Sequence, residues 1–347
     1  MSEGEYGSLS ATREGSGPSS WAEAHWHARN VSLYPSNNQD FLDVQSCISQ
    51  HLLSGDLPTK PVLTAEQNVI TIGSCFAAEL RHFLDEAGLS SNSFWIPSGL
   101  NNTFALKDFL SWVVTGKETA TGYRYQRNND GSIDDWAPEY EREFYLQKLI
   151  NASSFVFTIG LAEIWEDTIS KKVFWRGIPD DIFDEQRHFF RLSTVEENVD
   201  NLNCIISLLQ SINPKCSIVF TLSPVPLKAS FQDTSCMISD CVSKSVLRVA
   251  LHQVISEKHP NIYYWPSFEI IKWLGCHLPY PVYGTDDKVV RHVSRYMVLQ
   301  ILSSFTEVFY GKHIKEQVFD NFESALVKVD GEHGQPPFLF KGTVVSA

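Results

Sequence analysis

Five short apolar runs, separated by segments with helical periodicity, constrain the fold of this chain more than any other feature. The runs are Val69–Ile72, Ser93–Ile96, Phe155–Ile159, Ser217–Leu222 and Ile262–Trp265. Each is bounded by turn-forming residues and is apolar on both faces, as a strand in a covered parallel sheet must be. The helical patterns cover Ala77–Ala87, Phe104–Val114, Val195–Leu209, Val242–Ile255 and His292–Phe309. This alternation predicts an α/β protein, a three-layer α/β/α sandwich with a parallel sheet of about five strands.

The rest of the sequence is arranged around one such domain. Residues 1–20 are rich in Ser, Gly and Glu, and we expect them to be disordered. A single α/β domain is expected over residues 21–315, with an irregular lead-in that wraps the core. The polar, turn-rich stretch from about 116 to 139 is interpreted as an inserted excursion, and residues 316–347 as a peripheral tail.

Charge and cysteine content exclude several classes of function. A formal net charge of −13 argues against nucleic acid and anionic membranes as partners. No window of 18 uninterrupted apolar residues predicts a membrane span. Seven cysteines, an odd number in a chain whose first residues show no secretory signal, predict reduced thiols and a cytoplasmic location. Neither a Gly-x-Gly-x-x-Gly fingerprint nor a Walker loop is present, so no cofactor is expected.

The first candidate site is the turn Gly73-Ser74-Cys75, where a predicted strand stops and a helix begins. In open α/β sheets, ligands bind beyond the carboxyl ends of the strands. A cysteine in the first helical turn faces unpaired N–H groups and the positive end of the helix dipole, which favour the thiolate. The same pattern also fits a buried cysteine that acts as a small hydrophobe.

Two further strand ends and one late segment carry suggestive residues. Gly160 permits close backbone approach, and Glu163 is either a polar group over the pocket or a surface carboxylate in an ordinary loop. The rigid loop Thr221–Leu227 contains two prolines. Asp287 shortly before His292 is a candidate orienter and base, although a lone histidine is more often structural.

Several blocks together resemble the GSCFA family. Its name-giving motif is intact as Gly73-Ser74-Cys75-Phe76-Ala77, and later blocks similar to the family are GLAEIW at 160–165, TLSPVPL at 221–227, SKSVLRV at 243–249, WPSFEI at 265–270 and RHVS at 291–294. The resemblance covers roughly residues 60–310. That family is similar to the SGNH (GDSL-type) hydrolases, so the resemblance implies a flavodoxin-like sheet, ester hydrolysis and acyl transfer.

Carried over residue by residue, the hydrolase pattern places Cys75 at the nucleophile position. The Gly-x-Asn-Asp block corresponds to 160–163, with Ala162 where an oxyanion-binding asparagine is expected. Asn101 or Asn102 is then a candidate replacement. His292 fits the final Asp-x-x-His block, but Asp287 precedes it by five residues instead of three. Asp286 and Glu163 are alternative orienting acids, and a Cys–His pair without a strong acid is a further alternative.

The leading hypothesis is an acyl hydrolase or acyltransferase acting on a small-molecule ester or thioester, including a carrier-borne one. Cys75 attacks the carbonyl, His292 is general base and acid, and Asp287 orients the imidazole. The N–H groups of Cys75 and Phe76, with an asparagine from 101–102, hold the oxyanion. Ser74 is the second candidate nucleophile.

Two alternatives belong to other classes. The departures at Ala162 and Asp287 favour a non-catalytic ligand-binding module on a degenerate SGNH-like scaffold. A metal protein using His25 and His27, or Cys236, Cys241, Cys276 and His277, matches no common zinc spacing, so no metal site is predicted. The sequence does not specify the substrate or the oligomeric state.

Overall fold

A five-stranded parallel sheet forms the centre of the molecule. The computed structural model describes residues 7–11, 24–28, 33–53, 55–92, 100–116, 125–127, 133–135, 139–175, 177–178, 180, 182–286 and 288–326. The strands are β3 (Val69–Gly73), β4 (Ser91–Asn92), β7 (Ser154–Ile159), β10 (Ser217–Leu222) and β11 (Ile262–Trp265). Their spatial order is β11-β10-β7-β3-β4, with every neighbouring pair parallel. This is the flavodoxin-like order 2-1-3-4-5.

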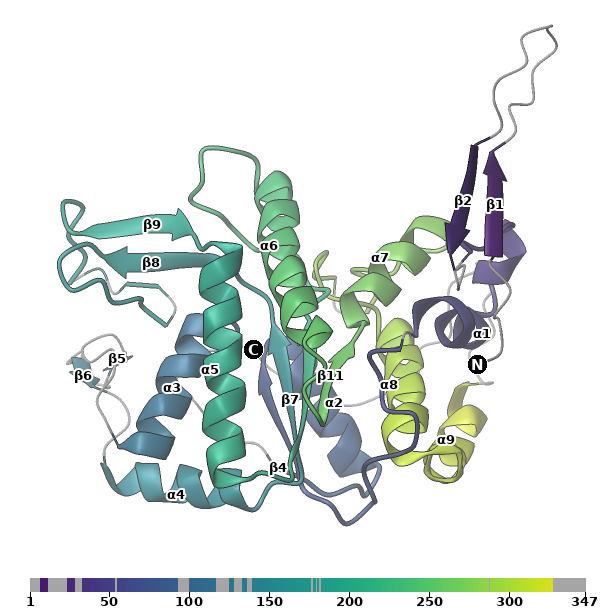
Figure 1. The fold of residues 1–347 in the computed structure, drawn as a ribbon, viewed down its shortest axis with the longest axis horizontal. Coiled ribbons are helices and arrows are strands. Elements are labelled where there is room, and N and C mark those ends of the chain that lie inside the picture. The colour runs from purple at the N-terminus through teal and green to yellow at the C-terminus, as the bar shows by residue number, and fades with distance from the viewer. Residues whose placement is uncertain are drawn as a thin grey trace, which may run out of the picture.

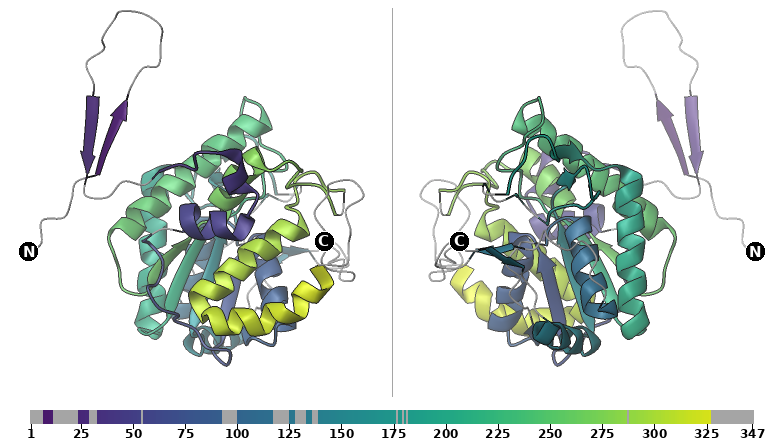
Figure 2. Two further views of the ribbon diagram at one scale, coloured as in Figure 1. Left: turned by 90° about the vertical axis from the view of Figure 1, so that its right-hand side faces the viewer. Right: turned by 90° about the vertical axis from the view of Figure 1, so that its left-hand side faces the viewer.

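Helices cover both faces of the sheet, because alternate strand residues point to opposite sides. Phe155 and Phe157 on one face of β7 pack with helices from residues 103–150 and 195–256, whereas Val156 between them packs on the other side with helices from residues 75–86 and 267–310. The two views of Figure 2 look at these helical layers in turn. The predicted three-layer α/β/α sandwich is therefore confirmed.

The helices of the domain begin and end close to the predicted limits. Those that cover the sheet are α2 (Cys75–Glu86), α3 (Thr103–Thr115), α4 (Glu139–Ile150), α5 (Val195–Ile212), α6 (Cys236–Ser256), α7 (Ser267–His277) and α8 (Arg295–Tyr310). Side-chain caps fix several starts: Ser74, Asn102, Thr194, Ser235 and Ser294 each accept a bond from a first-turn N–H. The helices α4 and α7 were not among the predicted patterns.

A long hairpin projects from this core. The strands β8 (Glu163–Asp167) and β9 (His188–Leu192) pair antiparallel, and Figure 1 shows them extending beyond α5. The interpretation of Glu163 as part of an ordinary loop is therefore wrong, because its backbone pairs with Leu192 and its side chain is buried.

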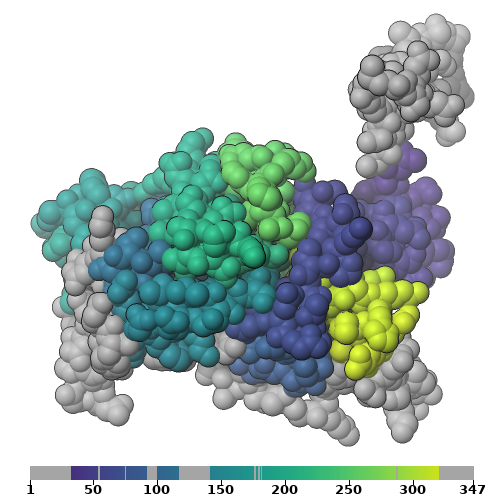
Figure 3. All heavy atoms as spheres, turned by 60° about the horizontal axis from the view of Figure 1, so that its bottom comes forward, coloured from purple at the N-terminus to yellow at the C-terminus, as the bar shows by residue number. Residues whose placement is uncertain are grey.

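The segment before β3 and the C-terminal helix lie together. The segment before β3 contains η1 (Asn38–Phe41), α1 (Val44–Cys47) and η2 (Ile48–Leu52). The N–H groups of Val62 and Leu63 donate to the carbonyl of Phe309 in α8. Figure 3 shows this purple segment beside the yellow helix α9 (Lys312–Leu326).

Several predicted boundaries meet elements that the sequence did not indicate. The boundary at 315 falls inside α9, whose Phe319 is buried and stacks on Phe83. β1 (Gly7–Ala11), within the segment expected to be disordered, pairs antiparallel with β2 (Ala24–Ala28) in the lead-in. β5 (Tyr125–Arg127) pairs antiparallel with β6 (Ile133–Asp135) within the excursion. The predicted strand Ser93–Ile96 lies outside the described residues.

Candidate active site

The strand order reverses between β3 and β7, and the carboxyl ends of these strands meet there. A sheet of this order binds its ligands at that switch point. The N–H of Ser74 donates to the carbonyl of Thr158 at 3.1 Å, which holds the two strand ends together. Gly73 has φ +135°, and a Cβ at this position would lie 2.1 Å from the Thr158 oxygen. Only glycine fits a turn this close to the neighbouring strand.

Helix α2 begins directly at this turn. Ser74 is its N-cap, and Ser74 Oγ accepts a hydrogen bond from the N–H of Phe76 at 3.3 Å. Cys75 is the first residue of the helix and is described by its backbone alone. The side chain of Phe76 is buried in the core. The Phe76 N–H, predicted as an oxyanion donor, is thus directed to the capping serine.

The two neighbouring asparagines have different surroundings. Asn102 is buried as the N-cap of α3: its Oδ1 accepts from the N–H of Ala105 at 2.8 Å, and its Nδ2 donates to the carbonyl of Trp175 at 3.0 Å. The backbone carbonyl of Asn101 accepts a hydrogen bond from the N–H of Gly160 at 2.7 Å. Its Oδ1 is buried with no hydrogen-bond partner among the residues that the structure describes. Asn101 therefore has bonding capacity left for a ligand, but the unsatisfied atom is an acceptor, and an oxyanion requires the Nδ2 donor of the same amide.

The loop after β7 is fixed from behind by helix α6. The buried Lys244 donates from Nζ to the carbonyl of Gly160 at 2.9 Å. The N–H of Ala162 donates to Ser243 Oγ at 2.9 Å, and the Ala162 side chain is fully buried. The position that carries an asparagine in the hydrolase pattern therefore contributes no side-chain donor.

Glu163 holds a second loop against this one. Its Oε1 accepts from Ser230 Oγ at 2.7 Å and from Gln232 Nε2 at 2.6 Å. Between these two residues, Phe231 packs its ring against Trp165 and Phe190, with centroids 5.4 and 5.3 Å away. A carboxylate and an aromatic cluster thus shape the rim of the site.

His292 reaches the site from the segment before α8. Its N–H donates to the carbonyl of Val289 at 2.9 Å, and its own carbonyl accepts from the N–H of Gly284 at 2.9 Å. Asp286 accepts hydrogen bonds from Thr285 Oγ1 and from the N–H of Arg295. Glu163 accepts hydrogen bonds from Ser230 and Gln232, and neither of these two alternative acids is hydrogen-bonded to His292. Asp287 lies outside the described residues.

An ion pair joins α2 and α8, the two helices that begin next to the switch-point segments. Arg295, at the start of α8, pairs with Glu79 on α2. The side chains are 22% and 29% exposed, and burial lowers the pKa of the guanidinium. A charged pair with little water around it fixes the distance between the turn at Ser74 and the segment that carries His292.

These segments enclose a cavity of about 520 Å³, which we call the switch-point cavity. Six of the predicted site residues line it: Ser74, Asn101, Asn102, Gly160, Glu163 and His292. Its wall also includes the aromatic side chains Trp165, Phe190 and Phe231, residues 223 and 225–229, and the basic side chains Lys244 and Arg291. Among the described residues, no group of three or more His, Cys, Asp or Glu side chains is placed to hold a metal ion.

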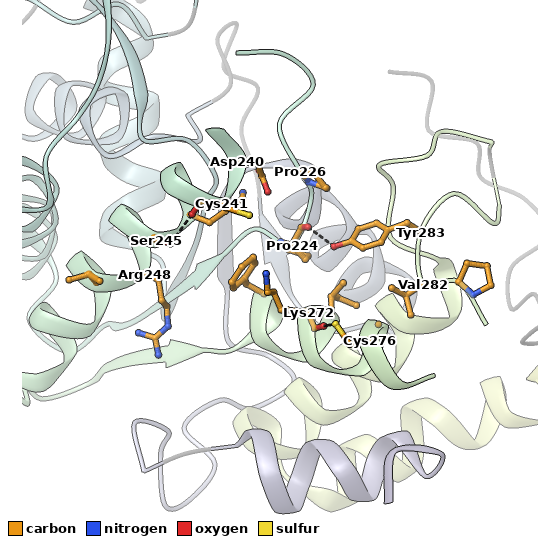
Figure 4. A pocket seen from close by; sticks show the side chains of 16 residues that line it. Pro224, Pro226, Asp240, Cys241, Ser245, Arg248, Lys272, Cys276, Val282 and Tyr283 are labelled. Atoms are coloured by element: carbon orange, nitrogen blue, oxygen red, sulfur yellow. Dashed lines mark hydrogen bonds between the residues drawn. The ribbon is translucent and has the colours of Figure 1, made fainter. Parts of the chain in front are cut away.

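A larger cavity of about 700 Å³ lies beside it, between α6 and α7. Figure 4 shows Cys241 and Arg248 on one wall, Lys272 and Cys276 on the other, and Tyr283 donating to the carbonyl of Pro224. We call it the helix cavity. The loop Ser223–Leu227 separates the two, since Pro224 lines only the helix cavity and Ser223, Val225 and Leu227 line only the switch-point cavity.

The family model of GSCFA proteins matches residues 68–305. The chain belongs to the GSCFA family. The match begins just before β3 and ends within α8, so it spans the sheet and every segment that lines the switch-point cavity. The resemblance inferred from the sequence blocks is confirmed.

The comparisons with individual proteins give fainter likenesses. Among solved structures, a family two carbohydrate esterase from Cellvibrio japonicus is 11% identical with a TM-score of 0.33, over 74% of this chain and 63% of that chain. A carbohydrate esterase family 2 enzyme with its carbohydrate binding domain, from Corynascus thermopiles (Myceliophthora fergusii), is 13% identical with a TM-score of 0.28, over 65% of this chain and 69% of that chain. The chain thus spans less than two thirds of the length of the first esterase. No curated protein matches the chain.

Sequence reasoning missed the aromatic rim and the basic residues of the cavity. Trp165, Phe190 and Phe231 come from three separate segments, and only the pairing of β8 with β9 and the bonds of Glu163 bring them together. Arg291 was visible as the residue before His292. No described helix is long and apolar enough to cross a membrane.

Proposed function

We propose that this protein is an acyl hydrolase or acyltransferase that uses Cys75 as a nucleophile on an ester or thioester. The observation that supports the proposal is the switch-point cavity, which Ser74, Asn101, Gly160 and His292 line from separate segments, with Cys75 following Ser74 at the start of α2. A nucleophile at a helix start, a histidine and an amide Nδ2 donor are parts that acyl transfer can use.

The proposed reaction has two stages. Cys75 Sγ attacks the carbonyl carbon while His292 takes the thiol proton, and the resulting oxyanion accepts hydrogen bonds from the N–H of Cys75 and from Asn101 Nδ2. The intermediate collapses to an acyl-enzyme, and the leaving alcohol or thiol receives the proton from His292. Water or another acceptor, deprotonated by His292, then attacks the acyl group and restores the Cys75 thiol.

The N-cap geometry favours Cys75 over Ser74 as the nucleophile. Ser74 Oγ already accepts the N–H of Phe76, and the cap stabilises the start of α2. A hydroxyl in that role would have to leave the cap in order to attack a carbonyl. Cys75 is the first residue of the helix, and the N-cap is Ser74.

We also place the protein in the cytoplasm. The six cysteines whose side chains the structure describes are all free thiols, which a reducing compartment maintains. We propose a small-molecule acyl substrate, including one carried on a thioester-bearing carrier, and no nucleic-acid partner.

A panel of 4-nitrophenyl esters and acyl thioesters tests the proposal. Cys75→Ala is expected to lower turnover by about a thousandfold or more. The matched control is Cys241→Ala, which removes an exposed thiol in the helix cavity and is expected to keep full activity. Ser74→Ala is expected to lower stability through the lost cap while turnover persists. Full activity in both Cys75→Ala and Ser74→Ala on every hydrolysed substrate would contradict the mechanism.

A non-catalytic ligand-binding module is the second candidate. It is favoured by the buried Ala162, whose side chain offers no donor where the hydrolase pattern has an asparagine. Titrating Cys75 with a thiol reagent against pH separates the two. A reactive thiol with a pKa below that of free cysteine supports the enzyme, and an unreactive thiol supports the binding module.

A further inference from the structure

Basic side chains gather around the switch-point cavity of an otherwise acidic protein. Lys228, Lys244 and Arg291 line it, and Glu163 is the one carboxylate among its described lining residues. The whole chain has a formal net charge of −13. A cavity whose charge opposes that of its protein attracts a ligand of the protein's own sign.

Glu163 forms no ion pair with Lys228 or Arg291. Its Oε1 accepts from Ser230 and Gln232, and no basic side chain of the cavity is hydrogen-bonded to it. The Glu163 carboxylate therefore holds the loop at 228–232 in place.

Arg291 keeps most of its donors available. Its Nη1 donates to the carbonyl of Pro226 at 2.9 Å, which fixes the half-buried guanidinium at the cavity, and no described carboxylate pairs with it. A guanidinium has five N–H donors in a planar fork that matches a carboxylate or a phosphate. Lys228, exposed at the same cavity, likewise makes no ion pair with any residue that the structure describes.

In the helix cavity of the same molecule, by contrast, the arginine is paired with a carboxylate. There, Arg248 Nε lies 2.5 Å from Glu269 Oε1 and its guanidinium stacks on Tyr264, 4.3 Å from the ring centroid. Asp240 accepts the N–H of Leu227 on that side of the loop. The guanidinium of the helix cavity has a protein carboxylate, whereas that of the switch-point cavity has a carbonyl.

We propose that the substrate carries an oxyanion group, a carboxylate or a phosphate, that Arg291 and Lys228 bind beside the ester. The proposal rests on the function proposed above for the identity of the reacting bond, but not for the binding itself. Because Arg291 directly precedes His292, the bound group lies close to the proposed base. An anionic substituent near the acyl or leaving group would therefore set which esters are used.

Equilibrium binding tests the proposal without any turnover. Succinate, inorganic phosphate and neutral succinamide are titrated calorimetrically into the full-length Cys75→Ala protein. We expect at least one of the two anions to bind and succinamide not to bind. Tighter binding of phosphate points to a phosphate-bearing substrate, and tighter binding of succinate to a carboxylate. No binding of either anion overturns the proposal.

Variants show whether the named residues do the binding. Arg291→Gln is expected to weaken anion binding by about ten- to a hundredfold, and Arg291→Lys by less, since it keeps the charge and loses the fork. Lys228→Met, at an exposed position, tests the same site if Arg291→Gln fails to fold. Lys272→Met in the helix cavity is the control and should leave binding unchanged. Unchanged affinity in both Arg291→Gln and Lys228→Met overturns the proposal.

Kinetics separate this proposal from the proposed function. If esters are hydrolysed, 4-nitrophenyl hemisuccinate should have a lower KM than 4-nitrophenyl butyrate, and Arg291→Gln should remove that preference. Hydrolysis without the preference contradicts the anion site and leaves the acyl-transfer function in place. Anion binding lost in Arg291→Gln but without hydrolysis of any ester contradicts the function and leaves the anion site in place.

Discussion

One cavity lies at the carboxyl ends of β3, β7 and β10, and a larger one lies behind the loop Ser223–Leu227, between α6 and α7. In the helix cavity, Arg248 is paired with Glu269 and packed on Tyr264. In the switch-point cavity, Asn101 has an unsatisfied buried oxygen, and Arg291 has no carboxylate among the described residues. We therefore expect the ligand in the switch-point cavity, although the helix cavity is larger.

The largest expected effect tests the switch-point cavity through its histidine. Loss of a general acid and base typically lowers turnover by about 10²- to 10⁴-fold, so His292→Ala should lower kcat by that factor. His252→Ala, an exposed histidine on α6, is the matched control and should keep full activity. Equal activity of the two variants would remove His292 from the mechanism.

The two asparagines sharpen the contrast between an incomplete and a satisfied group. Asn101→Ala should lower kcat by about 10²- to 10³-fold, because it removes the Nδ2 donor proposed for the oxyanion. Tm should change little, because Asn101 Oδ1 has no hydrogen-bond partner among the described residues.

Asn102→Ala is expected to do the reverse. It removes the N-cap of α3 and the bond to the Trp175 carbonyl, so the free energy of unfolding should fall by about 1–3 kcal/mol. Calorimetric melting and ester kinetics on both proteins check the pair. A stable but inactive Asn102→Ala protein would show that Asn102, and not Asn101, binds the oxyanion.

Glu163 tests how the rim of the cavity is held. Glu163→Gln keeps the size of the side chain but weakens its bonds to Ser230 and Gln232, so the loop that carries Phe231 should loosen. We expect KM to rise by about two- to tenfold with kcat little changed. Glu196→Gln, an exposed acid on α5, is the control. A drop in kcat with unchanged KM would indicate that Glu163 acts in the chemistry.

The smallest effect concerns the base of the β8–β9 hairpin. Arg191 bonds Glu166 through Nε at 2.6 Å and Glu197 through Nη1 and Nη2 at 2.8 and 2.6 Å. Hydrogen bonds from Arg191 lower the pKa of Glu197, so this stabilisation is present above the ordinary glutamate pKa and is lost as pH falls through the lowered value.

Arg191→Met should therefore lower Tm by about 2–6 °C at neutral pH, with less effect in acid. Scanning calorimetry at two pH values measures this difference. The same Tm loss at both pH values would show that packing rather than charge holds the hairpin.

The sequence predicted the sheet well because its strands are locally encoded. Ser217–Leu222 and Ile262–Trp265 are strands over the predicted residues, since each is an apolar run between turn residues. The pairing of Glu163–Asp167 with His188–Leu192 was missed, because the partner strand lies more than 20 residues away and its pattern is not periodic.

The strand ends predicted where a site could lie, and six of the predicted residues line one cavity, but the roles proposed for them depend on three-dimensional contacts. From the sequence alone, Asn101 and Asn102 are equivalent candidates. The N-cap of α3 shows that Asn102 has a structural role. The same holds for Arg291, whose bond to Pro226 joins residues 65 positions apart. Local patterns predict elements, whereas hydrogen-bond partners distant in sequence decide function.

The central claim is that Cys75 carries the acyl group, and mass spectrometry of the acylated protein tests it most directly. Wild-type protein is mixed with an acyl thioester, quenched in acid within milliseconds to seconds, and mapped by peptide. The account predicts a mass increase of one acyl group on the peptide that contains Cys75, which decays as product forms. Turnover without acylation of Cys75, or acylation of an exposed thiol such as Cys241 in its place, would contradict it.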